Sequence, residues 1–172
     1  GSTIIYNLIS SKAVSEVIAE NGGIGVRSRV GHSYIKSLMA ESGAIFGGEH
    51  SGHFYFSNFW RADSGMLAAL YALTELMATK NTLSELLKPF NRYVASGEIN
   101  SKVKDAEKSI ELIRKKYCDK YLVDDLDGLT ITADNWWFNL RPSNTEPLLR
   151  LNVEADTEKE MVKIRDTVLS LI

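Results

Sequence analysis

The stretch GLTITADNWWFNLRPSNTEPLLRLNVEA, residues 128–155, decides the fold of the second half of this 172-residue chain. It contains three strand-like runs, GLTITA, NWWFNL and LLRLNVEA, with only turn-like pieces between them. The last run alternates apolar with polar residues, as a strand does when one face is buried. Because short connections suit antiparallel neighbours, the three runs predict an antiparallel sheet.

Regular elements flank this stretch on both sides. A strand is expected around Glu98–Val103, followed by a helix with apolar residues on one face, and a second amphipathic helix ends the chain. The apolar positions of the two helices are Ala106, Ile110, Ile113, Tyr117 and Met161, Ile164, Val168, Leu171. The order βαβββα predicts a small α+β domain over residues 91–172, with one sheet covered on one face by two helices.

Residues 1–90 alternate strand and helix signals, which predicts an α/β layer. The expected strands are TIIYNL, IGVR and AIF, and the first helices are KAVSEVIAE and a segment ending near Gly43. A later helix, within residues 64–79, carries Met66, Leu70, Leu73 and Met77 at helical spacing, and these side chains are expected in the core. A boundary between two domains is expected at residues 90–97.

The loop RPSNTEP, residues 141–147, has the chemistry of a phosphate site. Its candidate ligands are Arg141, Ser143, Asn144 and Thr145. The guanidinium can bind phosphate oxygens in a bidentate way, and the hydroxyls and amide can donate at short range. Pro142 and Pro147 bracket the segment and are expected to end strand pairing, so that the donors point outward. A polar turn that only connects two strands is the alternative interpretation.

A second loop, GGEHSGH at residues 47–53, is predicted to bind sugar hydroxyls. Its glycines allow close approach of backbone amides, while Glu49, Ser51 and His53 offer a carboxylate, a hydroxyl and an imidazole. In VGHSYIK, His32 is a further candidate for hydroxyl contact or proton transfer, as is His53. A zinc site is disfavoured because no cysteine is near and the HExxH helix pattern is missing, so no metal ligand is assigned.

Composition narrows the class of protein. Twenty basic and 22 acidic side chains give a net charge of −2, so no overall field favours nucleic acid or a membrane surface. No apolar run approaches the length that spans a bilayer. The single cysteine, Cys118, allows no intrachain disulfide, which favours a cytoplasmic protein. The 44% hydrophobic content is ample for a core and leaves the oligomeric state open, with a monomer compatible.

The two loops, in this order, resemble those of the α-D-phosphohexomutase family, in its bacterial phosphomannomutase/phosphoglucomutase branch. GEHSGH, residues 48–53, matches the family's GExSGH sugar loop, and RPSNTEP matches its RxSNTxP phosphate loop. GHSYIK, residues 31–36, matches a GHxxIK segment. The resemblance covers residues 3–172 and implies the C-terminal part of the family's third domain, a layer with a mixed sheet, followed by its fourth, with a four-stranded antiparallel sheet.

The resemblance also implies an activity. Family members interconvert hexose 1-phosphate and hexose 6-phosphate, of mannose or glucose in this branch, through a phosphoserine and a bisphosphate intermediate. The phosphoserine loop (TASHNP-like) and the Mg²⁺ loop (DGDxDR-like) are missing from this sequence, which implies a C-terminal fragment that binds no Mg²⁺ and is inactive alone. Phosphoglucosamine mutase, whose loops read SGT and GEQSGH, and a stand-alone module that binds sugar phosphates remain the alternatives.

Overall fold

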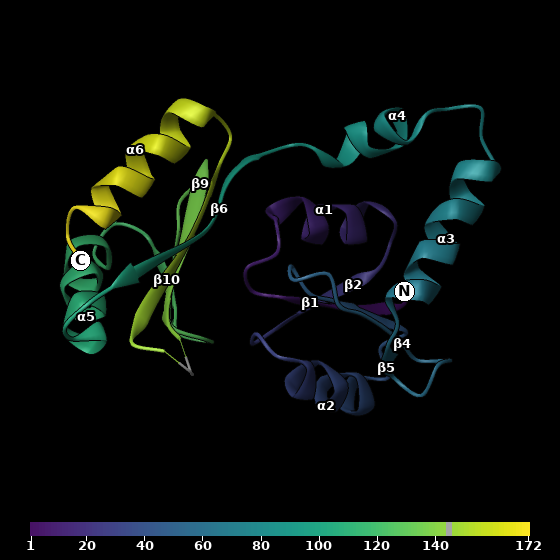
Figure 1. Cartoon of the computed structure of the whole chain (residues 1–172), viewed down its shortest axis with the longest axis horizontal. Coiled ribbons are helices and arrows are strands. Elements are labelled where there is room, and N and C mark those ends of the chain that lie inside the picture. Colours follow the sequence, from purple (N-terminus) through teal and green to yellow (C-terminus); the bar gives the residue numbers. More distant parts are fainter. Residues whose placement is uncertain (144–145) are drawn as a thin grey trace. The chain divides into compact units, whose positions relative to one another are not determined.

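The computed structural model describes residues 1–143 and 146–172, which form two compact units, Gly1–Arg92 and Tyr93–Ile172 (Figure 1). The first unit contains β1 (Thr3–Asn7), α1 (Lys12–Glu20), β2 (Ile24–Ser28), α2 (His32–Ser42), β3 (Phe46–Gly48), β4 (Phe54–Phe56), β5 (Ala62–Asp63), α3 (Gly65–Met77), α4 (Leu83–Leu87) and a 3-10 turn (Lys88–Phe90).

The sheet of the first unit is mixed, as predicted, with the strand order β2-β1-β3-β4-β5. Strands β2, β1 and β3 are parallel, and β4 and β5 are antiparallel to their neighbours. Helices α1 and α2 cover opposite faces of this sheet (Figure 1). The chain therefore leaves β1 on one side and returns to β3 on the other, which creates a topological switch point between these two strands.

Strand β3 begins and ends later than the sequence predicted. The run AIF was expected as the strand, with both following glycines in the loop, but β3 spans Phe46–Gly48. A Cβ atom on Gly47 would lie 2.8 Å from a methyl carbon of Ile35 and 3.3 Å from the sulfur of Met39, both on α2. The close packing of helix on sheet therefore requires a glycine at this position.

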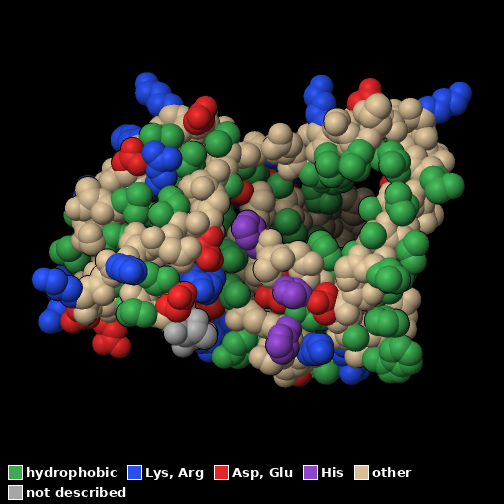
Figure 2. Space-filling model, viewed as in Figure 1, with side chains coloured by type: hydrophobic (Ala, Val, Ile, Leu, Met, Phe, Trp, Pro, Cys, Tyr) green, Lys and Arg blue, Asp and Glu red, His purple; other side chains and the backbone are tan. Residues whose placement is uncertain are grey.

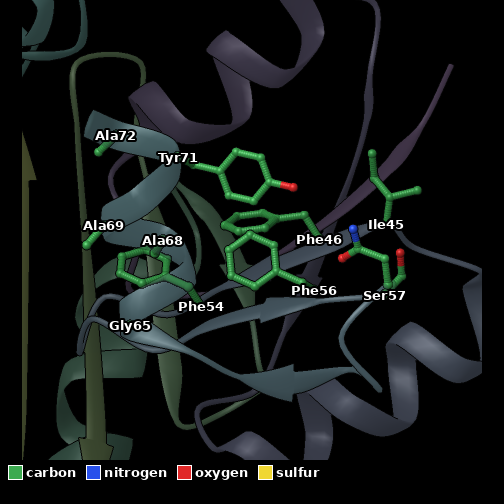
Figure 3. Close-up of a pocket in the computed structure, with 11 residues that line it drawn as sticks. Ile45, Phe46, Phe54, Phe56, Ser57, Gly65, Ala68, Ala69, Tyr71 and Ala72 are labelled. Atoms are coloured by element: carbon green, nitrogen blue, oxygen red, sulfur yellow. The ribbon is translucent and has the colours of Figure 1, made fainter. Parts of the chain in front are cut away.

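Helix α3 forms where it was expected, but its apolar stripe is not in the core. Met66 and Met77 are 79% and 85% exposed, and Leu70 and Leu73 are about half exposed. The helix approaches the sheet mainly through small residues and through Tyr71, whose ring stacks on Phe56 at a centroid distance of 5.4 Å. An open hollow of about 840 Å³ lies between α3 and the aromatic rings of β3 and β4 (Figures 2 and 3). The helical spacing thus predicted the helix correctly, but the prediction that its apolar face is buried in the core was wrong.

The second unit contains β6 (Val94–Lys102), α5 (Ala106–Tyr117), β7 (Leu122–Asp124), β8 (Leu129–Thr132), β9 (Trp136–Pro142), β10 (Leu148–Ala155) and α6 (Glu158–Leu169). Its sheet is antiparallel with the order β6-β10-β9-β8-β7, so it has five strands and not the four predicted. The missed strand, β7, is only three residues long, which is too short for a strand pattern to be recognised in the sequence.

Both helices of the second unit pack on one face of the sheet, as predicted. The buried core on this face includes Ile113 of α5, Phe138 and Leu140 of β9, Leu151 of β10 and Val168 of α6, all fully buried. The other face carries the polar residues of the alternating strands. Arg141 and Asn139 of β9 and Asn152 of β10 belong to it, and all three are buried.

A β-bulge interrupts the pairing of β6 with β10. Asn152 pairs with Glu98 and Glu154 pairs with Ala95, so Val153 faces two residues of β6, Ser96 and Gly97. The N–H of Val153 donates to the Ser96 hydroxyl at 3.0 Å, and Gly97 has a φ of +69°. This is the geometry of a bulge that uses a left-handed glycine.

Gly128, in the turn before β8, has less room for a side chain than any other glycine described in the second unit. Gly128 has a φ of +71°, and a Cβ atom there would lie 2.5 Å from the carbonyl oxygen of Leu140 and 2.6 Å from Cβ of Arg141. We expect Gly128→Ala to lower the free energy of unfolding by roughly 3 kcal/mol or more, because a left-handed alanine and a backbone clash act together. Denaturant unfolding followed by circular dichroism measures the loss.

Gly97→Ala is the matched control, because Gly97 has nearly the same φ, lies in the same unit and has open space where a Cβ atom would sit. Its expected cost is only about 1 kcal/mol, the cost of the backbone conformation alone. Equal losses for the two variants would contradict the clash at Gly128.

Candidate functional site

The predicted sugar loop is the connection between β3 and β4. Its backbone closes on itself: the N–H of Glu49 donates to the His53 carbonyl at 2.9 Å, and the N–H of Gly52 donates to the Glu49 carbonyl at 3.0 Å. Ser51 and His53 are exposed. This connection follows a parallel strand beside the switch point, where ligands of open α/β sheets bind.

Glu49 is buried and is engaged within the fold. One carboxylate oxygen accepts the Tyr55 hydroxyl at 2.7 Å, and the other accepts the N–H of Gly31 at 3.0 Å. Burial, together with this bond, raises the pKa of the Tyr55 hydroxyl, so it stays a donor. The carboxylate therefore joins the loop after β2 to strand β4, an internal role that the sequence analysis did not foresee.

His53 forms a close pair with Asp63 of β5. Its Nδ1 lies 2.6 Å from Asp63 Oδ2, and the other Asp63 oxygen accepts the N–H of Phe54 at 2.9 Å. The hydrogen bond to Asp63 raises the pKa of His53 above its ordinary value. Partial burial acts to raise the pKa of Asp63, but its bonds to His53 and Phe54 outweigh this and leave it lowered. With Nδ1 engaged, Nε2 of His53 is the ring atom that can meet a ligand.

The remaining polar residues of this half come from neighbouring elements. His32 is exposed at the first turn of α2, and Lys36 of the same helix lies close enough to help lower the pKa of Asp63. On the face drawn in Figure 2, histidine side chains lie beside acidic and basic ones. The N–H of His50 donates to the side chain of Asn7 at the end of β1. A cavity of about 490 Å³ between α1 and the sheet includes Glu49 and His50 in its lining.

The predicted phosphate loop begins later than expected. Strand β9 continues through Pro142, which pairs with Leu149, and the N–H of Ser143 still donates to the Leu148 carbonyl at 2.8 Å. The proline does not end the ladder, because hydrogen-bonded pairs alternate along antiparallel strands and the bond to β10 at this point comes from the N–H of Ser143, not from residue 142. Arg141 is therefore a strand residue, and it is only 6% exposed rather than pointing outward. Asn144 and Thr145 lie outside the described residues.

Arg141 has a second arginine beside it. The register of β9 and β10 places Arg141 directly opposite Arg150, and like charges opposite each other destabilise a sheet. Glu98 of β6 offsets this repulsion: its carboxylate oxygens lie 3.0 Å from Arg141 Nη2 and 3.6 Å from Arg150 Nη1. Arg150 Nη2 also donates to the Ser143 hydroxyl at 3.3 Å. The Nε atoms of both arginines are buried and have no hydrogen-bond partner among the described residues.

Sequence reasoning missed three residues of these sites: Asp63, Glu98 and Arg150. Arg150 was visible as a polar position of the alternating strand, but only the strand register shows that it faces Arg141. Asp63 sits in a two-residue strand, too short for any pattern. Glu98 lies on the same face of the sheet as the arginines because of the β-bulge in β6, and no pattern in the sequence predicted this bulge.

The described residues contain no group of three or more His, Cys, Asp or Glu side chains that could hold a metal ion. Among the helices of residues 1–143 and 146–172, none is long and apolar enough to cross a membrane.

Two family models match this chain. Residues 1–93 match the alpha/beta/alpha domain III of phosphoglucomutase/phosphomannomutase, and residues 98–171 match the C-terminal domain of the same family. A phosphomannomutase of Methanocaldococcus jannaschii is 49% identical over 98% of this chain, and one of Escherichia coli K12 is 40% identical over all of it. The chain spans only 37% and 38% of these two relatives.

Solved structures agree on the fold. A phosphoglucomutase/phosphomannomutase family protein of Burkholderia thailandensis superimposes with a TM-score of 0.85 at 28% identity, over 99% of this chain and 37% of that protein. A phosphoglucomutase of Paramecium, parafusin, gives 0.74 at 17% identity, over 98% of this chain and 37% of its own, which supports the fold alone. Since the two family models cover nearly every residue, the chain belongs to the phosphoglucomutase/phosphomannomutase family.

Proposed function

We propose that this chain supplies the sugar-binding and phosphate-binding parts of an enzyme that interconverts hexose 1-phosphate and hexose 6-phosphate, of mannose or glucose, through a phosphoserine and a bisphosphate intermediate. The observation that carries the proposal is the pair Arg141 and Arg150. Two guanidiniums lie side by side next to the Ser143 hydroxyl, and both have a buried Nε without a partner among the described residues. This donor set suits the oxygens of a phosphate dianion.

In this proposal the arginine pair, with Ser143, Asn144 and Thr145, holds the phosphate that is not reacting. Binding energy from that phosphate then positions the other end of the sugar for transfer. Arginine suits the task because its charge does not titrate and its N–H groups form a rigid fork. The phosphoserine and the Mg²⁺ site of the reaction are assigned to other parts of a longer protein. A related N-acetylphosphoglucosamine mutase of Aspergillus fumigatus is described in complex with GlcNAc-6P and magnesium.

The sugar side of the proposal rests on the exposed residues of the first unit. Ser51 and His53 present a hydroxyl and an imidazole Nε2 to sugar hydroxyls, with His32 as a further contact. Asp63 holds the His53 ring in one orientation and stabilises its charged form. Glu49 shapes the loop through Tyr55 and Gly31, and the remaining lone pairs of its carboxylate can accept a sugar hydroxyl.

The first test is of activity in the chain as it stands. We expect residues 1–172 to bind mannose 1-phosphate weakly and to produce no hexose 6-phosphate from glucose 1-phosphate, because the phosphoryl donor is lacking. A coupled dehydrogenase assay with Mg²⁺, and calorimetry for binding, measure the two. Turnover above a heat-denatured blank would contradict the proposed division of roles, whereas binding without turnover agrees with it.

The second test removes the phosphate contact. We expect Arg141→Ala to abolish hexose-phosphate binding by this chain and, in the longer parent, to lower kcat/KM by an amount equivalent to about 2 to 4 kcal/mol, by analogy with the truncation of other buried, hydrogen-bonded charge pairs. Arg165→Ala is the control, because Arg165 lies on α6 and pairs with Asp166. Thermal melts of both variants show whether the fold persists, and unchanged kinetics of Arg141→Ala would mean that this arginine is only structural.

The third test concerns His53. We expect Asp63→Asn to lower the pKa of His53 towards its ordinary value, because the carboxylate that stabilises the imidazolium is gone. Two-dimensional NMR of the imidazole carbons against pH measures the pKa, with the exposed Glu75→Gln on α3 as control.

The sign of the accompanying stability change follows from the raised pKa. The pair stabilises the fold below the ordinary pKa of histidine, and this contribution is lost as pH rises through the raised value. The stability deficit of Asp63→Asn should therefore shrink as the pH rises past neutrality. A His53 titration that is identical in the variant and the wild type would rule out the pair as the cause of the shift.

A further inference from the structure

Glu98 occupies the donors that a phosphate would use. Its carboxylate bridges Arg141 and Arg150, at 3.0 Å and 3.6 Å, and its side chain is 29% exposed, against 7% for Arg141. Arg150 is 27% exposed, so Glu98 and Arg150 form the more accessible part of the cluster and Arg141 its buried part. Both arginines keep a buried, unpartnered Nε among the described residues, so Glu98 satisfies them only in part.

The physical consequence has two sides. Without an anion beside them, two guanidiniums facing each other across a sheet would repel, and a buried cation without a partner is strongly destabilising. Glu98 therefore keeps the cluster folded and oriented when no phosphate is bound. The same negative charge repels an incoming phosphate dianion and competes for its donors, so it weakens the binding of phosphate.

We propose that Glu98 is a positioning residue that acts as an anionic placeholder: it holds Arg141 and Arg150 together in the empty site and keeps their affinity for phosphate low. This inference rests on the proposed role of the two arginines in phosphate binding. In the reaction proposed above, the sugar bisphosphate has to dissociate from this site and bind again through its other phosphate. Because Glu98 can pair again with the guanidiniums as the phosphate leaves, it raises the dissociation rate, through which affinity is mostly adjusted.

The test uses the whole 172-residue chain with inorganic phosphate as the probe. Glu98→Gln keeps the size of the side chain and a carbonyl that accepts a hydrogen bond, but removes the charge. We expect phosphate to bind about tenfold more tightly to this variant, the effect of one unit charge near the site. Calorimetry gives the affinity, and the Nε–H signals of the arginines in ¹H–¹⁵N spectra show whether phosphate reaches Arg141 and Arg150.

Glu107→Gln is the matched control, because it removes the same charge from an exposed position on α5. Its phosphate affinity should equal that of the wild type. A thermal readout separates a placeholder from a purely structural carboxylate. Without phosphate, the Glu98→Gln variant should melt lower than the wild type, but its Tm should rise more steeply with added phosphate because binding is tighter. A structural role alone would lower the Tm without increasing that slope.

Each outcome bears on a different claim. If phosphate does not bind the wild type, or if Arg141→Ala leaves its affinity unchanged, the proposed phosphate site fails and Glu98 loses its role with it. If binding depends on Arg141 but Glu98→Gln binds equally or more weakly, only the placeholder is overturned. Should Glu98→Gln not fold, Glu98→Asp withdraws the carboxylate by one methylene and keeps the charge, and a smaller tightening is then the expected result.

Discussion

A charged side chain that is taken out of water needs partners, and this constraint shapes both candidate sites. Glu49 is buried in the first unit, and it has partners only because the loop after β2 brings an N–H and β4 brings a hydroxyl to its two oxygens. Arg141 is buried in the second unit and depends in the same way on Glu98 from another strand. In each case one buried charge fixes the positions of segments that are distant in the sequence.

The local elements were largely predictable, because each has its own pattern in the sequence. The alternation in β10 and the helical spacing in α5 and α6 correspond to observed structure. The mixed sheet followed from the resemblance to the phosphohexomutases. What the patterns did not contain was β7, which is too short, and the extension of β9 through Pro142, which depends on its partner strand.

The sequence motifs identified residues of both candidate sites, but they did not identify the charged partners of these residues. The motif pointed to Arg141 and His53, yet their charged partners come from other strands, and only strand pairing brings these together. The apolar stripe of α3 shows the same limit: the spacing predicts that one face is apolar, but it does not predict whether that face is buried, and here it is exposed. The relatives are more than twice as long as this chain, so their contacts include many that the present sequence does not contain.

The bulge in β6 has a consequence for how variation in this family is judged. Val94 and Ile99 both pack against the hydrophobic core, although residues an odd number of positions apart in a regular strand lie on opposite faces. The extra residue inverts the phase of the strand, and this inversion brings Glu98 to the side that carries Asn152 and the arginines. A homologue that lacks one residue here would keep both signature loops intact, yet it would turn a carboxylate into its core and an isoleucine towards the two arginines.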